Sequence, residues 1–313
     1  MHVIELNHPY QPTQELAHSP GLVLAIGDFD GVHQGHREVI RRAISRAAER
    51  KLASAVMTFH PHPREVLGRE MYRHILTPLP DKLRLMEELG LTYTFLVKFD
   101  QAFSQLTPEE FVEQVLVKLN LDTVVVGFDF RFGRGGAGTP DSLATLAHGR
   151  FAVEVVRPFQ SDGQKVSSTL IRESLTEGQL EQANRLLERP YSISGEVVTG
   201  AGRGRTIGFP TANIQPAHKY VIPANGVYVV TAETDSGTYG GVMNIGVKPT
   251  FHVDEGRTLE AHLFDYTGSL YGEKLRVHFH AMLRPEKKFS SAEELIAQIK
   301  LDAEEAKSRL KSL

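Results

Sequence analysis

The sequence has no cysteine in its 313 residues. Disulfides, thiolate nucleophiles and zinc sites built on sulfur are therefore excluded. No apolar run approaches the roughly 20 residues that a membrane-spanning helix needs. The first residues, MHVIELNHPYQ, have neither the basic start nor the apolar centre of a secretory signal. We therefore expect a soluble, cytoplasmic protein.

The chain also lacks a large excess of charge of one sign. Its formal net charge is −3, and 23% of its residues are charged. A general nucleic-acid binder would carry a basic face, whereas a small anionic ligand needs only local positive charge. We expect small-molecule substrates, no nucleic-acid or membrane partner, and a monomer or weak homo-oligomer.

The first half of the chain alternates between strand and helix patterns. Apolar strand patterns occupy residues 22–27, 54–59, 92–99, 121–128 and 151–156, and helical patterns lie between them at 35–51, 80–89, from 107 and from 139. Thr107, Pro108 and Glu110 have the spacing of a capping box. This alternation predicts an α/β domain with a doubly wound parallel sheet of Rossmann type.

The pattern changes near Arg189 and Pro190. Short strand patterns separated by Gly, Pro and Asn turns follow, such as SISGEVV, GVYVVTAE, YGGVMNIG, TLEAHLF and KLRVHFHAML, and a helix is predicted only at 290–310. These features predict a small antiparallel Greek-key barrel with a terminal helix. We place the two domains at residues 1–186 and 187–313.

The segment GDFDGVHQGH, residues 27–36, comes directly after the apolar strand pattern at 22–27. In open α/β sheets, ligands bind beyond the carboxyl ends of strands, and a helix N-terminus there favours an anion. Glycine lets the backbone approach a ligand closely. The segment therefore predicts a phosphate site that uses Gly27, Asp30, Gly31, His33, Gly35 and His36.

Two other interpretations of this segment stay open. Asp28 or Asp30 can join the two histidines around a metal ion, although zinc sites rarely crowd all their ligands so tightly. Asp30 can instead cap the helix, with both histidines incidental.

HxGH after a strand resembles the nucleotidylyltransferase superfamily, whose members transfer AMP from ATP to an acceptor phosphate. Such enzymes carry a second phosphate-binding element late in the domain, and KVSSTLIRESL (165–175) fits that description. Lys165, Ser168, Thr169 and Arg172 are its candidate phosphate ligands. An ordinary helix capped by serine is the alternative.

Two further segments are candidates for the same site. Asp129, in GFDFRFGRGGAG (127–138), can accept hydrogen bonds from adenine or ribose, and His62, in HPHPRE (60–65), can reach the ligand. Plain turns account for both segments about as well.

A second glycine-rich segment, GAGRGRTIGFPTAN, covers residues 200–213. Its glycine spacing does not match a dinucleotide fingerprint, and it lacks the Gly-Lys-Ser/Thr of a Walker loop. We interpret it as a nucleotide-binding flap formed by Gly200, Gly202, Gly204, Arg205, Gly208 and Pro210. Thr211 and Asn213 add oxygens suited to Mg²⁺ or phosphate. A flexible barrel loop is the alternative.

A kinase acting on an alcohol needs a base near the acceptor hydroxyl. In TLEAHLFDY (258–266), strand alternation places Glu260, His262 and Phe264 on one face. We expect Glu260, in the mouth of a barrel, to be the base, with His262 as second choice. A strand face turned to solvent is the alternative.

Over nearly its whole length the chain resembles the bacterial bifunctional riboflavin kinase/FAD synthetases. The resemblance rests on these segments, taken in order: GDFDGVHQGH, GFDFRFG, VSSTLIR, GFPTANI, NGVYVV, NIGVKPTF and EAHLFD. The resemblance implies that the C-terminal half phosphorylates riboflavin with ATP to FMN. The N-terminal half would adenylylate FMN to FAD and release pyrophosphate.

The resemblance also implies residue roles. Thr211 and Asn213 would hold Mg²⁺ and the phosphates of ATP, and Glu260 would act on the ribityl 5′-hydroxyl. His33, His36, Ser168 and Arg172 would bind ATP in the other half. Two positions depart from the pattern: Lys165 stands where some relatives have arginine, and His60 stands where an acid is usual.

Two rival functions remain. One is an adenylyltransferase with a single activity on another phosphorylated acceptor, which would not need the GFPTAN half. The other is a non-catalytic flavin- or nucleotide-binding module, against which the intact HxGH, SSTxIR, Thr211 and Glu260 argue.

Overall fold

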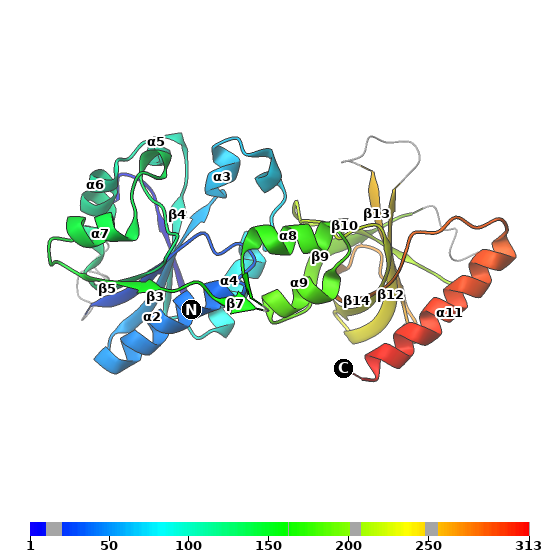
Figure 1. The fold of residues 1–313 in the computed structure, drawn as a ribbon. Helices are drawn as coiled ribbons and strands as arrows, with labels where there is room; N and C mark the ends of the chain where they lie inside the picture. The colour runs from blue at the N-terminus through cyan, green and yellow to red at the C-terminus, as the bar shows by residue number, and fades with distance from the viewer. Residues whose placement is uncertain (11–20, 162, 201–207, 248–255, 313) are drawn as a thin grey trace. The chain divides into compact units, whose positions relative to one another are not determined.

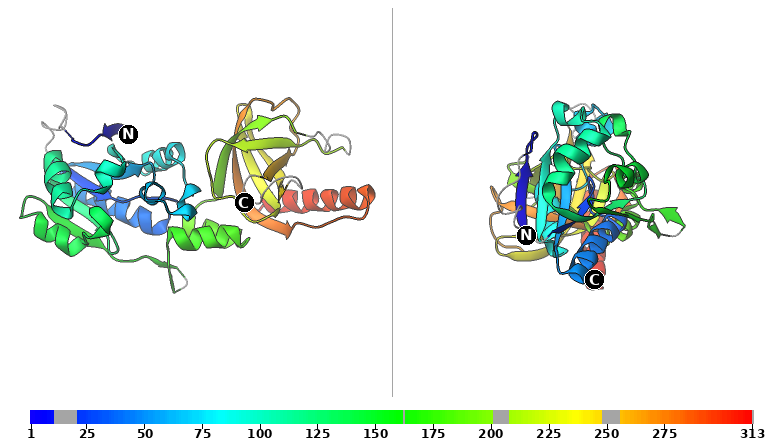
Figure 2. Two further views of the ribbon diagram at one scale, coloured as in Figure 1. Left: turned by 90° about the horizontal axis from the view of Figure 1, so that it is seen from above. Right: turned by 90° about the vertical axis from the view of Figure 1, so that its left-hand side faces the viewer.

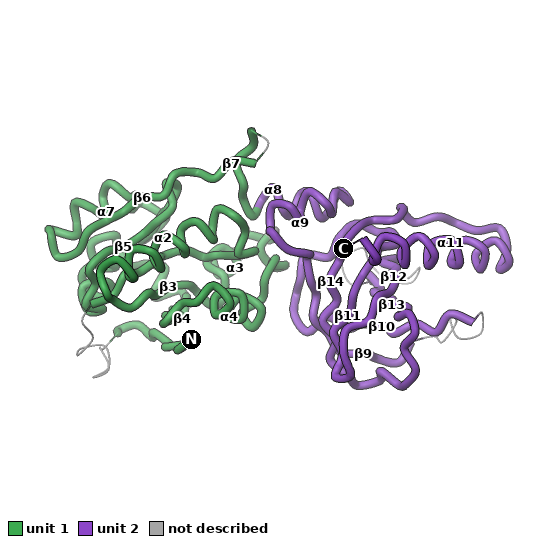
Figure 3. The backbone as a smooth tube through the Cα atoms, turned by 90° about the horizontal axis from the view of Figure 1, so that it is seen from below, with its two compact units in different colours: residues 1–168 green, residues 169–313 purple. Residues whose placement is uncertain are grey.

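The computed structural model describes residues 1–10, 21–161, 163–200, 208–247 and 256–312. The chain divides into two compact units, Met1–Ser168 and Thr169–Leu313 (Figure 3). Among the described residues, no helix is long and apolar enough to cross a membrane.

The first unit is built on a parallel sheet of six strands in the order β1-β4-β3-β2-β5-β6 (Figure 1). The strands are β1 (His2–Leu6), β2 (Leu22–Ile26), β3 (Ala53–His60), β4 (Tyr93–Lys98), β5 (Leu121–Gly127) and β6 (Ala152–Val156). The predicted doubly wound fold is confirmed. The edge strand β1 was not predicted, so GDFDGVHQGH follows the second strand of the chain rather than the first (Figure 2).

Helices connect these strands. They are α2 (Gln34–Arg50), α3 (Pro63–Val66), α4 (Leu79–Glu88), α5 (Gln101–Ser104), α6 (Pro108–Phe111) and α7 (Pro140–Leu146), with shorter or irregular turns η1 (Glu70–Arg73), η2 (Val112–Leu116), η3 (Val117–Leu119) and η4 (Arg134–Gly136). The predicted capping box at Thr107 and Glu110 is present, and a second one forms at Thr139 and Ser142. A small hairpin, β7 (Gln160–Ser161) and β8 (Gln164–Lys165), precedes the end of the unit.

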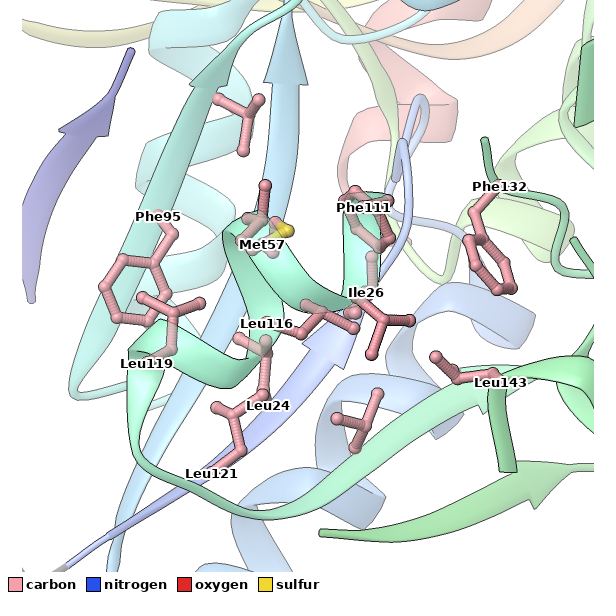
Figure 4. Close-up of a cluster of buried hydrophobic side chains, with 14 of the residues drawn as sticks. Leu24, Ile26, Met57, Phe95, Phe111, Leu116, Leu119, Leu121, Phe132 and Leu143 are labelled. Atoms are coloured by element: carbon pink, nitrogen blue, oxygen red, sulfur yellow. The ribbon is translucent and has the colours of Figure 1, made fainter. Parts of the chain in front are cut away.

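Both faces of the parallel sheet are buried. On one face Leu24 and Ile26 of β2 pack with Phe111 and Leu116 (Figure 4). On the other face Val23 and Ala25 of the same strand pack under α2 and α4. Since alternate residues of a strand point to opposite faces, the continuous apolar run LVLAI is what a strand covered on both sides requires.

The second unit is a closed antiparallel barrel with the strand order β10-β13-β12-β11-β14-β9, as predicted (Figure 1). Its strands are β9 (Tyr191–Val198), β10 (Ala212–Pro216), β11 (Gly226–Thr234), β12 (Gly237–Val247), β13 (Arg257–Leu263) and β14 (Lys274–Pro285). Strand β10 was not predicted, because the preceding GFPT suggested only a turn.

The terminal helix α11 (Ala292–Leu310) lies on the outer surface of the barrel (Figure 2). Its Ala306 packs with Val227, Val229 and Val242, which point outward from β11 and β12. On the same surface Asp302 of α11 accepts hydrogen bonds from Arg284 at 2.8 and 3.1 Å. Apolar contact and a buried ion pair thus hold this helix against one side of the barrel.

Two helices, α8 (Ser168–Thr176) and α9 (Leu180–Leu187), precede the barrel strands. Helix α9 is bonded to the barrel: Asn184 donates to the carbonyl of Phe279 at 2.8 Å and accepts from the N–H of Tyr191 at 2.8 Å. Helix α9 therefore belongs to the second compact unit, Thr169–Leu313. The domain boundary at 186/187 stays a prediction.

We predict that residues 1–186 and 187–313 each fold when expressed alone, because each has its own sheet and core. A longer fragment, 169–313, should melt higher than 187–313 by roughly 5 °C or more, because it retains the contacts of α9 with the barrel. Thermal unfolding followed by circular dichroism, with the full chain as reference, measures both. If neither half melts cooperatively, the two-domain interpretation is wrong.

Candidate active sites

The parallel sheet has a point at which its strand order reverses. Strand β2 pairs with β3 on one side and with β5 on the other. The segments that leave β2 and β5, at Gly27 and Phe128, therefore start at the same edge of the sheet. Ligands of open α/β folds bind at such a switch point.

The loop between β2 and α2 has an unusual backbone. Gly31 has φ 94°, but Phe29 and Val32 also have positive φ, at 55° and 43°. For a β-branched residue such as Val32 this is a strained conformation, and strain of this kind is found mainly at functional sites. Phe29 is buried with its ring against Gly27, where a Cβ would lie 2.8 Å from it.

The two histidines of HxGH are stacked at the start of α2. Their ring centroids lie 3.6 Å apart. His33 is the N-cap residue, and its Nδ1 accepts a hydrogen bond from the backbone N–H of His36 at 3.3 Å. A ring nitrogen that accepts carries no proton, so neutral His33 has its proton on Nε2. Gly35 leaves room for this arrangement, because a Cβ there would lie 3.3 Å from the His33 ring.

Asp30 is directed away from the helix that it was expected to cap. Its carboxylate is buried and accepts hydrogen bonds from the backbone N–H groups of Leu76 and Thr77 at 2.9 and 3.0 Å. Its backbone carbonyl accepts from the hydroxyl of Ser168 at 2.8 Å. Asp30 therefore links the HxGH loop to the start of the SSTLIR helix, and the capping interpretation is wrong because His33 caps α2.

Two other candidates from distant parts of the sequence come together. Nζ of Lys165 lies 2.6 Å from Oδ2 of Asp129, and 4.5 Å from the centre of the Phe128 ring. Both charged side chains are about half exposed. This pair brings the β7–β8 hairpin to the carboxyl end of β5. Both residues are candidates from the sequence, but nothing in the sequence predicts their contact.

Beside the loop lies a charge cluster of half-buried Asp28 with buried His62 and Lys82, of which only Lys82 was not a sequence candidate. Asp28 forms an ion pair with His62, and Lys82 donates to the carbonyl of Asp28 at 2.6 Å. Burial acts to raise the pKa of Asp28, but the hydrogen bond from His62 and the charge of Lys82 outweigh it and lower the pKa. His62 is thus placed against the loop, whereas Lys82 lies in a helix and had no sequence signal.

Thr169 and Arg172 follow Ser168 on α8, in the second unit, and Arg172 is 5% exposed. Their approach to a nucleotide stays a prediction. The expected departure at His60 lies at the end of β3.

The second candidate site lies on the barrel, where GFPTAN enters β10. Asn213 packs against Gly200: a Cβ on Gly200 would lie 2.0 Å from its Nδ2 and 2.8 Å from its Oδ1. Only glycine leaves that space, so residue 200 and the start of β10 are in contact. Gly208 has φ 84° and Pro210 follows it. Gly202, Gly204 and Arg205 lie outside the described residues.

Glu260 stands opposite Asn213 in the ladder between β13 and β10. On β13 the buried side chains are Leu259, Ala261 and Leu263, which face the barrel interior. Glu260 and His262 are half-buried and face outward. The expectation that Glu260 lies within the barrel mouth is wrong, because strand alternation assigns the interior to the apolar residues.

His262 is held by the GFPTAN segment. Its Nδ1 lies 2.8 Å from the carbonyl of Pro210, and its ring meets Phe209 edge to face with centroids 5.4 Å apart. These contacts place Thr211 and Asn213 beside Glu260 on the outer surface. Thr211, Asn213 and Glu260 together present hydroxyl, amide and carboxylate oxygens, a donor set that suits Mg²⁺.

The described residues contain no group of three or more His, Cys, Asp or Glu side chains that could hold a metal ion. Two of the groups that the metal interpretation of the HxGH loop would use are directed to backbone N–H groups. They are Nδ1 of His33 and the carboxylate of Asp30.

Comparison with known proteins matches both units. The family model described as FAD synthetase matches residues 15–170, and the one described as riboflavin kinase matches residues 187–310. The bifunctional riboflavin kinase/FMN adenylyltransferase of Bacillus subtilis (strain 168) is 41% identical to this chain. The protein of the same description from Listeria monocytogenes is 42% identical to it. The first alignment covers 98% of this chain and 97% of the relative, and the second covers 98% of each.

A solved structure from Streptococcus pneumoniae, described as a macrolide-efflux protein, superposes with a TM-score of 0.86. It is 31% identical, and the match covers 96% of this chain and 97% of that one. The arrangement of strands and helices is therefore shared along nearly the whole length.

We predict that Asp30→Ala lowers the free energy of unfolding of the first unit by roughly 2–4 kcal/mol, because the N–H groups of Leu76 and Thr77 lose a buried acceptor. Chemical denaturation measures the change. Glu70→Ala is the matched control, because Glu70 forms only an exposed pair with Arg73 and should change stability by less than about 1 kcal/mol. Unchanged stability in Asp30→Ala would contradict the assigned role.

Proposed function

The chain belongs to the family of bifunctional riboflavin kinase/FMN adenylyltransferases, and on that premise we propose which residues carry each of its two reactions. The protein phosphorylates riboflavin with ATP to FMN and adenylylates FMN with ATP to FAD. Riboflavin, FMN, ATP and FAD are thus its substrates and products. The residue roles below are proposals.

The adenylyl transfer is assigned to the switch point of the first unit. A phosphate oxygen of FMN forms a bond to the α-phosphorus of ATP, and the bond from that phosphorus to the bridging oxygen breaks, so that pyrophosphate leaves. The protein must hold two anions together and stabilise charge on the moving phosphoryl group. Backbone N–H groups at the start of α2 and the protons of His33 and His36 supply that stabilisation.

Further groups of the first unit complete this site. Gly27, Gly31 and Gly35 let the backbone approach the phosphates, and Ser168 stands beside them, with its hydroxyl donating to the carbonyl of Asp30. Thr169 and Arg172 belong to the second unit and stay candidate phosphate ligands by the resemblance alone. We expect Asp129 to accept hydrogen bonds from the ribose or adenine of ATP. Its ion pair with Lys165 then opens, and the Lys165 ammonium group becomes available to bind a phosphate. An exposed pair of this kind is worth about 0–1 kcal/mol, so a nucleotide can readily replace it.

The kinase reaction is assigned to the outer surface of the barrel. The ribityl 5′-oxygen forms a bond to the γ-phosphorus of ATP, the bond to the β-phosphate oxygen breaks, and ADP leaves. Glu260 orients the hydroxyl and accepts its proton. The glycine-rich segment is the candidate for binding the phosphates of ATP, through Gly200, Gly208 and Pro210 and through Gly202, Gly204 and Arg205, which lie outside the described residues.

Mg²⁺ is proposed as the metal of the kinase site, with Thr211 and Asn213 as its ligands. Their oxygens are hard donors of the type that Mg²⁺ prefers, and the amide of Asn213 packs against Gly200. When bound, Mg²⁺ neutralises charge on the phosphates.

The single observation that carries the kinase assignment is the pairing of Asn213 with Glu260 across β10 and β13. Directly opposite residues on one face have Cβ atoms about 4.5–5.5 Å apart. The phosphate-binding segment and a carboxylate base therefore adjoin each other, as phosphoryl transfer to an alcohol requires. An adenylyltransferase with a single activity would have no use for this arrangement.

A cytoplasmic location, the absence of nucleic-acid and membrane partners, and a monomeric or weakly self-associating state stay predictions.

His36→Ala should remove most FAD synthesis and leave FMN formation largely intact. Loss of a donor to a charged transition state costs roughly 10²–10³ in rate. Initial rates of FAD formation from FMN and of FMN formation from riboflavin test this. The exposed His148 gives a control, His148→Ala, which should alter neither rate. Equal loss of both activities in His36→Ala would mean that the reactions are assigned to the wrong units.

Glu260→Gln should bind riboflavin and ATP nearly normally but form FMN slowly, by a factor of about 10²–10⁴, because the amide keeps the hydrogen bond and lacks the basicity. FMN supplied directly should still become FAD at the normal rate. Fluorescence quenching measures flavin binding. The exposed carboxylate of Glu196 on β9 supplies the control, Glu196→Gln. An unimpaired kinase rate in Glu260→Gln would make His262 the next residue to test.

A further inference from the structure

Phe128 and Asp129 lie side by side at the carboxyl end of β5, in a turn whose backbone is held by hydrogen bonds. The N–H of Phe128 donates to the carbonyl of Val156 on β6 at 3.0 Å, and the N–H of Phe130 donates to the carbonyl of Gly127 at 3.0 Å. Phe128 is nevertheless 40% exposed, and the Asp129 side chain is 58% exposed. This edge of the switch point therefore presents an aromatic face and a carboxylate together.

One side chain, that of Lys165, contacts both of these groups. Its Nζ lies 2.6 Å from Oδ2 of Asp129 and 4.5 Å from the centre of the Phe128 ring. The ammonium group thus forms an ion pair and a cation–π contact at the same time. Lys165 belongs to β8 of the small hairpin, where it stands opposite Gln160 of β7.

The residues on either side of this hairpin are held beside the HxGH loop. Before the hairpin, Phe159 lies against the start of α2, because a Cβ on Gly35 would be 3.9 Å from the Cβ of Phe159. After the hairpin, the hydroxyl of Ser168 donates to the carbonyl of Asp30 at 2.8 Å. Lys165 is three residues from Ser168, a span of at most about 10 Å. Its long side chain therefore stays within reach of both the HxGH loop and the turn after β5.

The two partners of Lys165 are groups that a nucleoside can also use. A carboxylate accepts hydrogen bonds from the amino group of a base or from a ribose hydroxyl, and an aromatic ring packs against the face of a base. The Lys165 ammonium group has donors only, so a ligand that takes its place on Asp129 and Phe128 leaves it in need of another acceptor. The phosphates of a nucleotide supply that acceptor, whereas a bare nucleoside does not.

We propose that Lys165 is an internal competitor for Asp129 and Phe128, which a nucleotide displaces and then binds through a phosphate. This inference rests on the adenylyl transfer proposed for the first unit. Both contacts of Lys165 are exposed and weak, so their displacement lowers the affinity of an incoming ligand by a factor of roughly three to ten. A nucleotide recovers this loss through the new contact between Lys165 and its phosphate. A nucleoside does not recover it, so the competitor makes the site selective for nucleoside phosphates.

Lys165→Gln in the full-length protein separates this role from that of an ordinary phosphate ligand. The inhibition constant of adenosine in FAD formation from FMN should fall about three- to tenfold, because the competitor is gone. The KM for ATP in the same reaction should rise about tenfold, because a charged hydrogen bond to phosphate is lost. An ordinary phosphate ligand would raise the KM for ATP and leave inhibition by adenosine unchanged.

Lys98→Gln is the matched control, because Lys98 is an exposed lysine at the carboxyl end of β4, on the same edge of the sheet. Its loss should change either constant by less than about twofold, since exposed charges at such distances are screened. Ionic strength gives a test without substitution. Raising it from 0.1 to 1 M shortens the Debye length from about 10 to 3 Å, which should strengthen inhibition by adenosine in the unmutated protein and not in Lys165→Gln.

Phe128→Trp adds a measurement that does not depend on activity, because the chain contains no tryptophan and an indole ring keeps the cation–π contact. Quenching of this fluorescence by acrylamide should increase when Lys165→Gln is combined with Phe128→Trp, because the ring face is then uncovered. Unchanged quenching, or an adenosine inhibition constant that stays the same or rises in Lys165→Gln, would overturn the proposal. Absence of FAD formation by the unmutated protein would instead show that the proposed adenylyl transfer is wrong, and the quenching measurement would still decide whether Lys165 covers residue 128.

Discussion

The parallel pairing of β2 with β5 is the constraint on which the first unit depends. Hydrogen bonds between parallel strands bring their carboxyl ends to the same edge, so the HxGH loop and the loop that carries Asp129 must both begin there. The apolar residues of β2 pack on both faces and hold this edge rigid. The adenylyl transfer proposed for this edge needs such a base, because it brings two phosphates together against their repulsion.

The loop itself is strained, and the surrounding contacts compensate. Val32 keeps a positive φ while Arg37 donates to its carbonyl at 3.2 Å. Asp30 ties the loop to residues 76 and 77, and Asp28 ties it to His62 and Lys82. The acidic side chains of this loop are therefore structural in large part, because they are directed to the protein.

In the second unit the deciding constraint is strand alternation. The closed barrel fills its interior with apolar residues, so polar residues at the alternate positions are placed outside. A shift of one residue in the register of β13 would exchange Glu260 for Ala261 on the outer face and destroy its pairing with Asn213 and Asn244. Packing of the core thus determines which residue of β13 stands beside Asn213 and Asn244.

Local patterns in the sequence were sufficient for the sheet and barrel classes, most strands and helices, and both proline-led helix starts. They missed β1 and β10, which lack clear flanking signals, and the expected interior position of Glu260 was wrong. Contacts such as Asp30 with Leu76, Lys165 with Asp129 and Asp28 with Lys82 join residues 36 to 54 positions apart. Periodicity reports which residues share a face of one element, whereas only the tertiary register decides which faces meet.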